Sequence, residues 1–338
     1  MKKFINRHKW NFLRILIVVS IFFYLYATGQ LDIGKLGRVW KRPELLGLAA
    51  FLVILSTLIA TQRWRVLLKA QEFELGLGSA IRLSLIGFFF SAAIPGAVSG
   101  DMVKAYYLAK GKEEKERLFT SVIFDRFLGL YSMFLVASLA VLSIVILGKT
   151  AGNQVVWPNA DAKILAIFIS VTFLCITLFW GLFMTERLKR TRLMAFILNS
   201  GPFHETLAKM YDAMREYGRK PGMTLNAMFL SLAAQFCLYF AMWCLALLLE
   251  IGELNFMQYL FALPVGFVIN AIPLAPGGLG VGEAGFRGIF LLFNFNKGAE
   301  LAMLFHAIFF LLALGLGGMA YLVSDLSNTK DALKGHCR

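Results

Sequence analysis

Residues 268–283 read VINAIPLAPGGLGVGE: an apolar segment runs into Ile-Pro, then into glycines, and ends on a single carboxylate. Residues 88–101, in the first half of the chain, read FFFSAAIPGAVSGD and follow the same order. Proline lacks an N–H and clashes with the preceding helical turn, whereas glycine lets the backbone turn sharply or approach a ligand closely. Each stretch therefore predicts a helix that breaks and restarts, with hinges at Pro95, Pro273 and Pro276.

A restarting helix points its unpaired N–H groups and the positive end of its dipole into the gap. Such a gap suits an anion, and the phosphate of a lipid headgroup is the obvious anion in a membrane. Two interrupted segments in corresponding places of two halves indicate an inverted repeat with a binding site near the membrane midplane. The alternative is that both clusters are only tight packing turns between helices.

The rest of the chain is too apolar for a soluble protein. Of its 338 residues, 59% are hydrophobic and 16% are charged, whereas soluble domains carry about 25% charged residues. We predict an all-α polytopic membrane protein that forms one integral membrane domain over residues 1–338, with no soluble domain after the last span. A span needs about 20 apolar residues. The six predicted full spans are residues 12–29, 44–61, 118–147, 163–184, 223–250 and 299–323.

Two further apolar stretches, 79–97 and 257–275, contain the breaks. The positive-inside rule places both termini in the cytoplasm, in a bacterial-type inner (cytoplasmic) membrane, although the predicted external loop 30–43 is also basic. Each broken stretch must then enter and leave on one face, as two re-entrant hairpins from opposite sides. Non-helical backbone at that depth is tolerated only where it is buried in protein or lines a wet cavity. The basic segments are the N-terminus, 62–78, 98–117 and 185–222.

The net charge of +14 would suggest nucleic-acid binding in a soluble protein. Here lysine and arginine lie in short loops, where they fix orientation and attract anionic headgroups. We therefore expect anionic or phosphate-bearing membrane lipids as partners, and no nucleic acid; cell-envelope biosynthesis proteins are further candidates. The four cysteines form no C-x-x-C pair and no Cys/His cluster, which predicts neither a metal site nor a cofactor.

Ionisable residues inside apolar segments usually face a cavity or a partner. Asp101 and Glu283 each suit a helix N-cap, or alternatively a proton, a cation or a basic partner. Arg126 matches a lipid phosphate because its planar fork donates two hydrogen bonds; pairing with a carboxylate such as Asp101 is an equal alternative. Arg82 and Arg287 could complete a basic lining. Single polar residues in spans, expected to join helices by hydrogen bonds, are His306, Asn270 and Gln235.

The segment 185–222 mixes basic and apolar residues at helical spacing, as in Met210, Met214 and Tyr217 beside Lys209. This pattern predicts an amphipathic helix on an anionic cytoplasmic leaflet. A connecting loop that carries topology charges is the equally good alternative.

Three motifs resemble the lysylphosphatidylglycerol synthetase transmembrane-region family of flippase-like membrane proteins: IPGAVSGDMVKAYYLAKG, FDRFLGL and IPLAPGGLGVGEAGF. Ser99 stands where that family usually has glycine, and Lys104 where it has arginine. The resemblance implies a flippase-type fold with re-entrant helices. In two-part relatives this membrane region moves an aminoacylated phospholipid made by a cytoplasmic domain, and other relatives are linked to polyprenyl-linked sugars. The positions that agree with the family are Asp101, Arg126, Pro276, Gly277, Gly278, Gly280 and Glu283.

We expect a flippase that moves a phosphate-bearing phospholipid or polyprenyl-linked lipid, without enzymatic activity. The alternatives are a non-catalytic lipid-binding or scaffold subunit, and an enzyme on a lipid-linked substrate with Asp101 or Glu283 as base. The expected headgroup contacts are Ser99, Gly100, Lys104, Arg126, Asp101, Glu283, Gly277, Gly278, Gly280, Arg82 and Arg287.

Overall fold

The computed structural model describes residues 42–94, 99–109, 114–150, 160–184, 204–249, 256–272, 277–323 and 333–335. The predicted first span, 12–29, and the predicted hinges Pro95, Pro273 and Pro276 lie outside these ranges. The fold is an all-α membrane protein, as predicted.

Five helical segments are long and apolar enough to cross a membrane, and they match the five predicted full spans that fall within the described ranges. Proline occupies the first turn of α2 and α10, where its missing N–H costs nothing. The spans are α2 (Pro43–Ala70), α5 (Lys115–Thr150), α6 (Ala160–Met184), α10 (Pro221–Leu248), and the continuous run of α13 (Gly298–Leu312), the π-helical turn η2 (Ala313–Gly317) and α14 (Gly318–Val323).

Helix α2 corrects one prediction, because it continues through residues 62–70, which the sequence assigned to a loop. Trp64, Leu67 and Leu68 are fully buried in this extension, so packing carries the helix past the point where the apolar run ends. The basic residue Arg63 therefore lies within a spanning helix and is buried.

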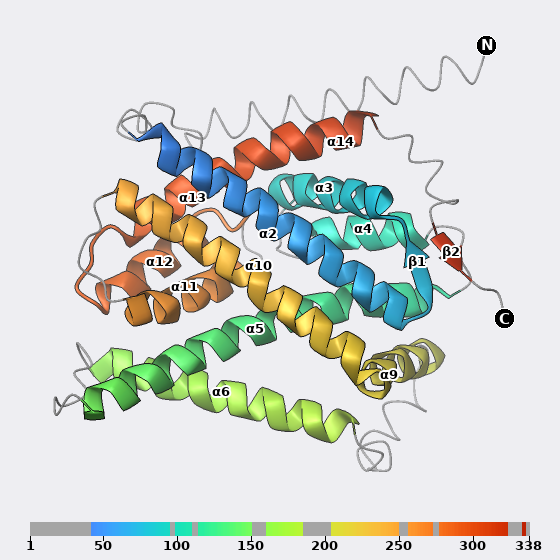
Figure 1. Ribbon diagram of the computed structural model, residues 1–338, viewed down its shortest axis with the longest axis horizontal. Helices are drawn as coiled ribbons and strands as arrows, with labels where there is room; N and C mark the ends of the chain where they lie inside the picture. The colour runs from blue at the N-terminus through green and yellow to red at the C-terminus, as the bar shows by residue number, and fades with distance from the viewer. Residues whose placement is uncertain are drawn as a thin grey trace.

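Both broken stretches form two helices joined at a break. The first consists of α3 (Leu77–Ala93) and α4 (Ser99–Ala109), and the second of α11 (Phe256–Asn270) and α12 (Val281–Leu291). Within each pair the two arms pack on each other, which makes each a helical hairpin. Figure 1 shows the two pairs at opposite ends of the long axis. This is the predicted arrangement of opposed hairpins.

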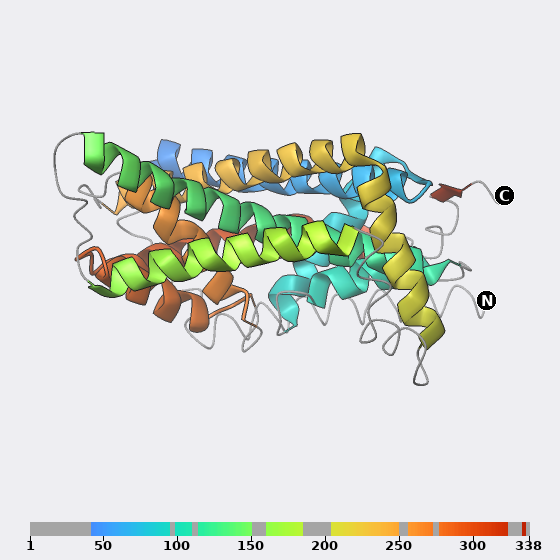
Figure 2. The same cartoon turned by 90° about the horizontal axis from the view of Figure 1, so that it is seen from below.

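The contacts follow an inverted repeat. Helices α2 and α10 pack side by side along their length, and each precedes one hairpin. The hairpins exchange partners between the halves, since α11 packs on α5 of the first half and α3 packs on η2 and α14 of the second. From below, α2 and α10 share one layer, and α4 and α12 lie beneath it at opposite ends (Figure 2).

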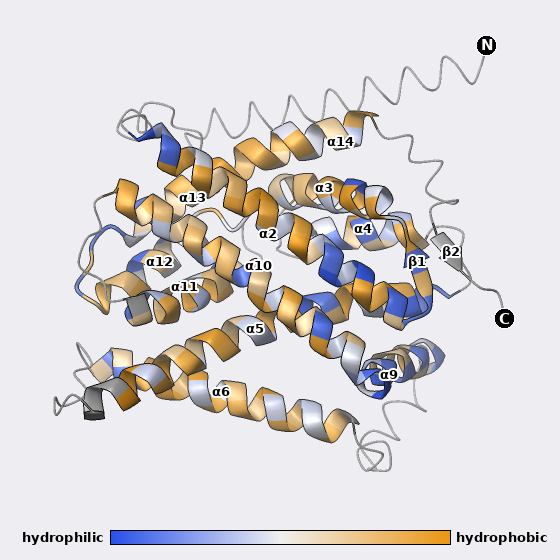
Figure 3. Cartoon of the chain, in the orientation of Figure 1, coloured by the Kyte–Doolittle hydropathy of each residue, from blue (hydrophilic) through white to orange (hydrophobic). Residues whose placement is uncertain are grey.

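The end of the bundle that holds α9 (His204–Arg219) is polar (Figure 3). Strand β1 (Phe73–Leu75) pairs there with β2 (Leu333–Gly335), a short antiparallel ribbon that the sequence analysis did not predict. Helix α9 replaces the predicted loop alternative and is amphipathic, but its apolar face covers protein: Tyr217 stacks on Phe124 of α5 with 4.0 Å between ring centroids. Burial raises the pKa of the Tyr217 phenol.

Candidate functional site

Arg126 of α5 forms an ion pair with Asp101 of α4 through its Nε. The other Asp101 oxygen lies 3.4 Å from the Nζ of Lys104, one turn further along α4. Lys104 also sits over the Trp64 ring of α2, 4.0 Å from its centroid. The Asp101 and Lys104 side chains are buried, whereas 47% of the Arg126 side chain is exposed. Arg126 of the FDRFLGL motif thus links α4 of the first hairpin to the following span, α5.

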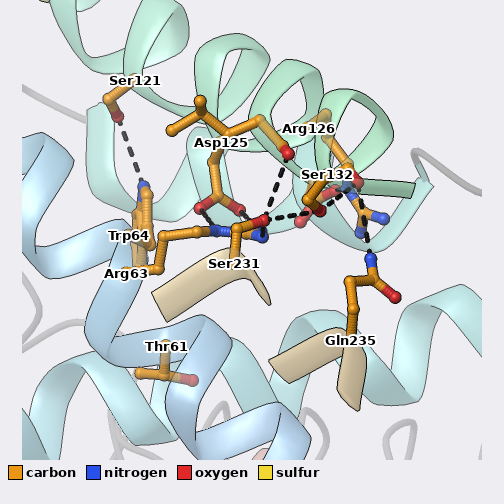
Figure 4. A network of polar contacts seen from close by, with 12 residues as sticks. Thr61, Arg63, Trp64, Ser121, Asp125, Arg126, Ser132, Ser231 and Gln235 are labelled. Atoms are coloured by element: carbon orange, nitrogen blue, oxygen red, sulfur yellow. Dashed lines mark hydrogen bonds and ion pairs between the residues drawn. The ribbon is translucent and has the colours of Figure 1, made fainter. Parts of the chain in front are cut away.

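The neighbouring residue, Asp125, faces a different helix, because successive residues of an α-helix point about 100° apart. Its two oxygens accept hydrogen bonds from Arg63 of α2, from Nε at 2.7 Å and from a terminal nitrogen at 3.0 Å. The other terminal nitrogen of Arg63 donates to Ser231 of α10 at 2.9 Å, and Ser231 in turn contacts Ser132 (Figure 4). This buried network ties α2, α5 and α10 together.

The two ion pairs share one cavity of about 250 Å³, lined by residues of α2, α3, α4 and α5 and by Phe305 and Phe309 of α13. Three cations and two carboxylates line it, a formal sum of +1. In a low-dielectric interior a surplus positive charge favours an anionic guest. Ligand pockets measure about 300–1,000 Å³, so this cavity suits a headgroup and not a whole lipid. Its charged lining consists of Arg63, Lys104, Arg126, Asp101 and Asp125.

The second hairpin has a matching pair. Glu283 of α12 accepts a hydrogen bond from the Gly280 N–H at 2.6 Å. The predicted N-cap position is wrong, because Gly280 is the N-cap and Glu283 is the third residue of the helix, from which its side chain reaches back to the cap. Its other oxygen lies 2.7 Å from His306 Nδ1 on α13, and His306 Nε2 lies 3.0 Å from Oδ1 of Asn270. The expectation that His306 and Asn270 join helices is therefore confirmed. Gln235 does the same, since it donates to the Gly129 carbonyl of α5 at 3.4 Å.

The two hairpins meet at their breaks, where the N–H of Gly277 donates to the Ser91 carbonyl at 3.2 Å. Gly277, Gly278 and Gly280 all have positive φ, between 62° and 83°, which L-residues with a Cβ adopt at a cost. At Gly278 a side chain would also collide with Asn270. The glycines predicted at the break are thus required by backbone conformation.

The remaining predicted site residues lie elsewhere or serve packing. Ser99 donates to the Ile94 carbonyl at 3.1 Å and so links the two sides of the first break. Gly100 lies against the Gly87 carbonyl with no room for a Cβ, so it lets α4 approach α3 closely. Arg82 and Arg287 are exposed and are not among the residues that line the cavity.

Sequence reasoning missed Arg63 and Ser231. Arg63 was counted as a loop charge because the apolar run of α2 ends before it. A usable signal was present: Thr57 and Thr61 place small polar groups on successive turns that lead to Arg63, and all three line the cavity. Ser231 carries no such signal, because serine is common on packed membrane helices.

Comparison with known proteins finds similar membrane proteins along most of the chain. The family model described as lysylphosphatidylglycerol synthase TM region matches residues 11–317. A UPF0104 membrane protein of Methanocaldococcus jannaschii is 30% identical over 118 residues, which are 34% of this chain and 35% of that protein. A UPF0104 membrane protein of Pyrococcus horikoshii is 21% identical over 325 residues, 91% of this chain and 96% of that protein. No solved structure matches the chain.

Proposed function

The chain belongs to the lysylphosphatidylglycerol synthase TM region family, and from that premise we propose that it moves a phosphate-bearing lipid between the two leaflets of a membrane. The substrate class is an anionic phospholipid or a polyprenyl-linked phosphate, and the protein acts as a transporter without covalent chemistry. The observation that carries the proposal is the half-exposed Arg126 in a cavity of formal charge +1.

Arg126 is suited to reversible binding of a phosphate group. Its Nε is engaged by Asp101, and its two terminal nitrogens carry four further N–H donors on a side chain that is 47% exposed. Phosphate oxygens accept two such hydrogen bonds in parallel. Asp101 offsets part of the positive charge, which keeps binding weak enough for release, as any transport site requires.

The position of the cavity also supports transport. Its lining includes Ser84, Gly87 and Ser91 of α3, and Ser91 is the residue that contacts the tip of the second hairpin. A headgroup beside Arg126 would therefore contact the first hairpin, α3 and α4, close to the place where Ser91 meets the second hairpin. Sites at the interface of inverted repeats serve alternating access, because either repeat can move away from the bound group.

We further propose that the end of the bundle holding α9 and the strand pair faces the cytoplasm. Basic residues are dense there, which the positive-inside rule associates with the cytoplasmic side. We also propose cytoplasmic chain termini, as the positive-inside rule predicts from the sequence, in a cytoplasmic (inner) membrane whose anionic lipids are attracted to that end.

The test measures retained lipids and lipid movement on the same preparations. Wild-type protein, Arg126→Ala and the matched control Arg287→Ala are purified gently, and their bound lipids are identified by native mass spectrometry. We expect one phosphate-bearing class to be retained by wild type and control and reduced roughly tenfold or more in Arg126→Ala, since a hydrogen bond to a charged group contributes about 1.5–3 kcal/mol.

The same three proteins are then reconstituted in vesicles that contain the retained lipid class with a fluorescent label. Dithionite quenching reports how fast the label reaches the outer leaflet. Movement that depends on Arg126 but not on Arg287 supports the proposal. Equal retention of bulk lipids and equal movement in all three proteins would refute the headgroup site and favour a scaffold role.

A further inference from the structure

His306 lies outside the cavity, at the junction of α11, α12 and α13. Its side chain is 2% exposed, and both ring nitrogens face oxygen atoms: Glu283 Oε1 at 2.7 Å and Asn270 Oδ1 at 3.0 Å. A carboxylate and an amide oxygen are acceptors only. An imidazolium, which donates from both nitrogens, satisfies this arrangement with no unmade hydrogen bond.

The neutral ring satisfies it only after a rearrangement. A neutral imidazole donates from one nitrogen and accepts at the other. If Nδ1 still donates to Glu283, Nε2 needs a donor, and the Asn270 amide must turn so that its NH₂ group faces the ring. Gain or loss of one proton at His306 therefore changes the orientation of the Asn270 side chain.

Asn270 is built into the break of the second hairpin. Gly278 and Gly282 lie so close to its side-chain oxygen that neither position has room for a Cβ. A rotated amide places an NH₂ donor in place of the oxygen against this backbone, one residue from Gly277, whose N–H donates to the Ser91 carbonyl of the other hairpin. Ser91 lines the headgroup cavity. A continuous set of contacts thus leads from His306 to the cavity.

A more direct connection between His306 and the cavity lies within α13. Phe305, next to His306 in the chain, and Phe309, about one turn on, both line the cavity. His306 is therefore the chain neighbour of a residue in the cavity wall.

Few other charges face this ring. Helix α12 contributes Glu283, and its Arg287 is exposed; Glu300 at the start of α13 is also exposed. Helices α10 and α11 carry no Asp, Glu, Lys or Arg, only the titratable side chains Cys237, Tyr239, Cys244 and Tyr259. Helix α2 contributes Arg63, on the cavity side of Phe305, and α14 contributes Tyr321. Glu283 is accordingly the ionisable partner in direct contact with His306.

We propose that His306, Glu283 and Asn270 form a proton-binding site whose occupancy is linked to the presence of a lipid headgroup in the cavity. One proton from the aqueous phase forms one N–H bond on a neutral imidazole, and it leaves by the reverse step. The linkage rests on the proposed function, whereas the proton site itself does not. A proton fits better than a metal cation because His306 Nδ1 and Glu283 Oε1 are at a hydrogen-bond distance of 2.7 Å, and no third His, Cys, Asp or Glu joins them among the described residues.

Two measurements on the full-length protein in lipid nanodiscs test the proposal. The first is NMR of ¹⁵N-histidine-labelled protein between pH 5 and 9, with the His306 signal identified by its loss in His306→Gln. The second is the affinity for short-chain phosphatidylglycerol across the same pH range. The variants are His306→Gln and Glu283→Gln, and His204→Gln at the start of α9 is the matched histidine control.

We expect the His306 signal to change between neutral and imidazolium forms within this range, and to titrate at a different pH in Glu283→Gln. In the wild type the probe should shift that titration, and by reciprocity its affinity should vary with pH, within the roughly 5–150-fold range of typical couplings. His306→Gln should bind the probe with little pH dependence, and His204→Gln should behave as wild type. If His306→Gln does not fold, the pH dependence of probe binding is compared between wild type and Glu283→Gln alone.

Three results are decisive. A His306 signal that does not titrate between pH 5 and 9 overturns the proton site, whatever the lipid does. A titrating signal, with a pH dependence of lipid binding that persists unchanged in His306→Gln and Glu283→Gln, overturns the linkage while the transport proposal stands. A titrating signal with no binding of phosphatidylglycerol or of a polyprenyl phosphate, tested in the same way, supports the proton site and removes the proposed function and its linkage.

Discussion

The two halves of the molecule solve one structural problem with different chemistry. In each, a carboxylate on the second arm of a hairpin pairs with a basic side chain on the next long helix: Asp101 with Arg126, and Glu283 with His306. The exposure differs sharply, because Arg126 is 47% exposed and His306 only 2%. A permanent cation therefore faces the cavity in the first half, and a histidine ring is buried outside the cavity in the second.

This difference matches the two roles that we propose for the repeats, anion binding in the first and proton binding in the second. Arginine stays charged at every physiological pH, so it suits a site that must always accept an anion. Histidine changes charge near neutrality, so it suits a site that senses or carries a proton. Both halves share a carboxylate that anchors the hairpin to the next span. The basic partner is what distinguishes them.

The largest expected effect comes from breaking the buried ion pair of the first half. Arg63→Ala leaves Asp125 buried without its partner, and loss of one member of a buried pair costs about 3–5 kcal/mol. We expect the detergent-solubilised variant to lose a large part of its thermal stability, measured by fluorescence-detected size-exclusion chromatography after heating. Arg82→Ala, which removes an exposed arginine, should stay within about 0.5 kcal/mol of wild type. Equal stability of the two variants would mean that Asp125 is not held by Arg63.

We expect an intermediate loss of stability when one methyl group is added to a glycine in each hairpin. Gly100→Ala presses on the Gly87 backbone, and Gly278→Ala combines a positive φ with a collision against Asn270. Each should destabilise the fold by about 1–3 kcal/mol. Gly288→Ala is the control, because its Cβ meets open space in α12; it should be neutral or stabilising by up to about 1 kcal/mol. The same heating assay ranks the three, and a Gly100→Ala protein as stable as Gly288→Ala would contradict the close approach of α3 and α4.

The smallest expected effect sharpens the comparison of the carboxylates. Asp101→Asn raises the formal charge of the cavity from +1 to +2, and should increase retention of anionic lipid roughly two- to fivefold, on the scale of a partly exposed ion pair. Transport should slow at the same time, because the headgroup leaves less readily. Glu300→Gln removes an exposed carboxylate from the start of α13 and should change neither property. Native mass spectrometry and vesicle assays measure both, and reduced retention in Asp101→Asn would show that Asp101 contributes to binding directly.

The sequence by itself determined the membrane-spanning helices and the two hairpins. Apolar runs of span length, and two Ile-Pro-glycine breaks in matching order, are local patterns, and backbone chemistry acts on them locally. The contact of Glu283 with the Gly280 N–H is local in the same sense, because the two residues are three positions apart, although the predicted N-cap position itself was wrong.

Only the tertiary structure decided which ionisable groups meet. Arg63 and Asp125 are 62 residues apart, and Glu283 and His306 are 23 apart, so their pairing depends on how separate helices pack. The same holds for exposure: Arg126 and Asp125 are neighbours in the sequence, yet one faces the cavity opening and the other a buried arginine. Local sequence patterns predict where a helix forms and where it breaks. A site in a helical bundle lies between the faces of several helices, and the sequence does not show which of these faces contact one another.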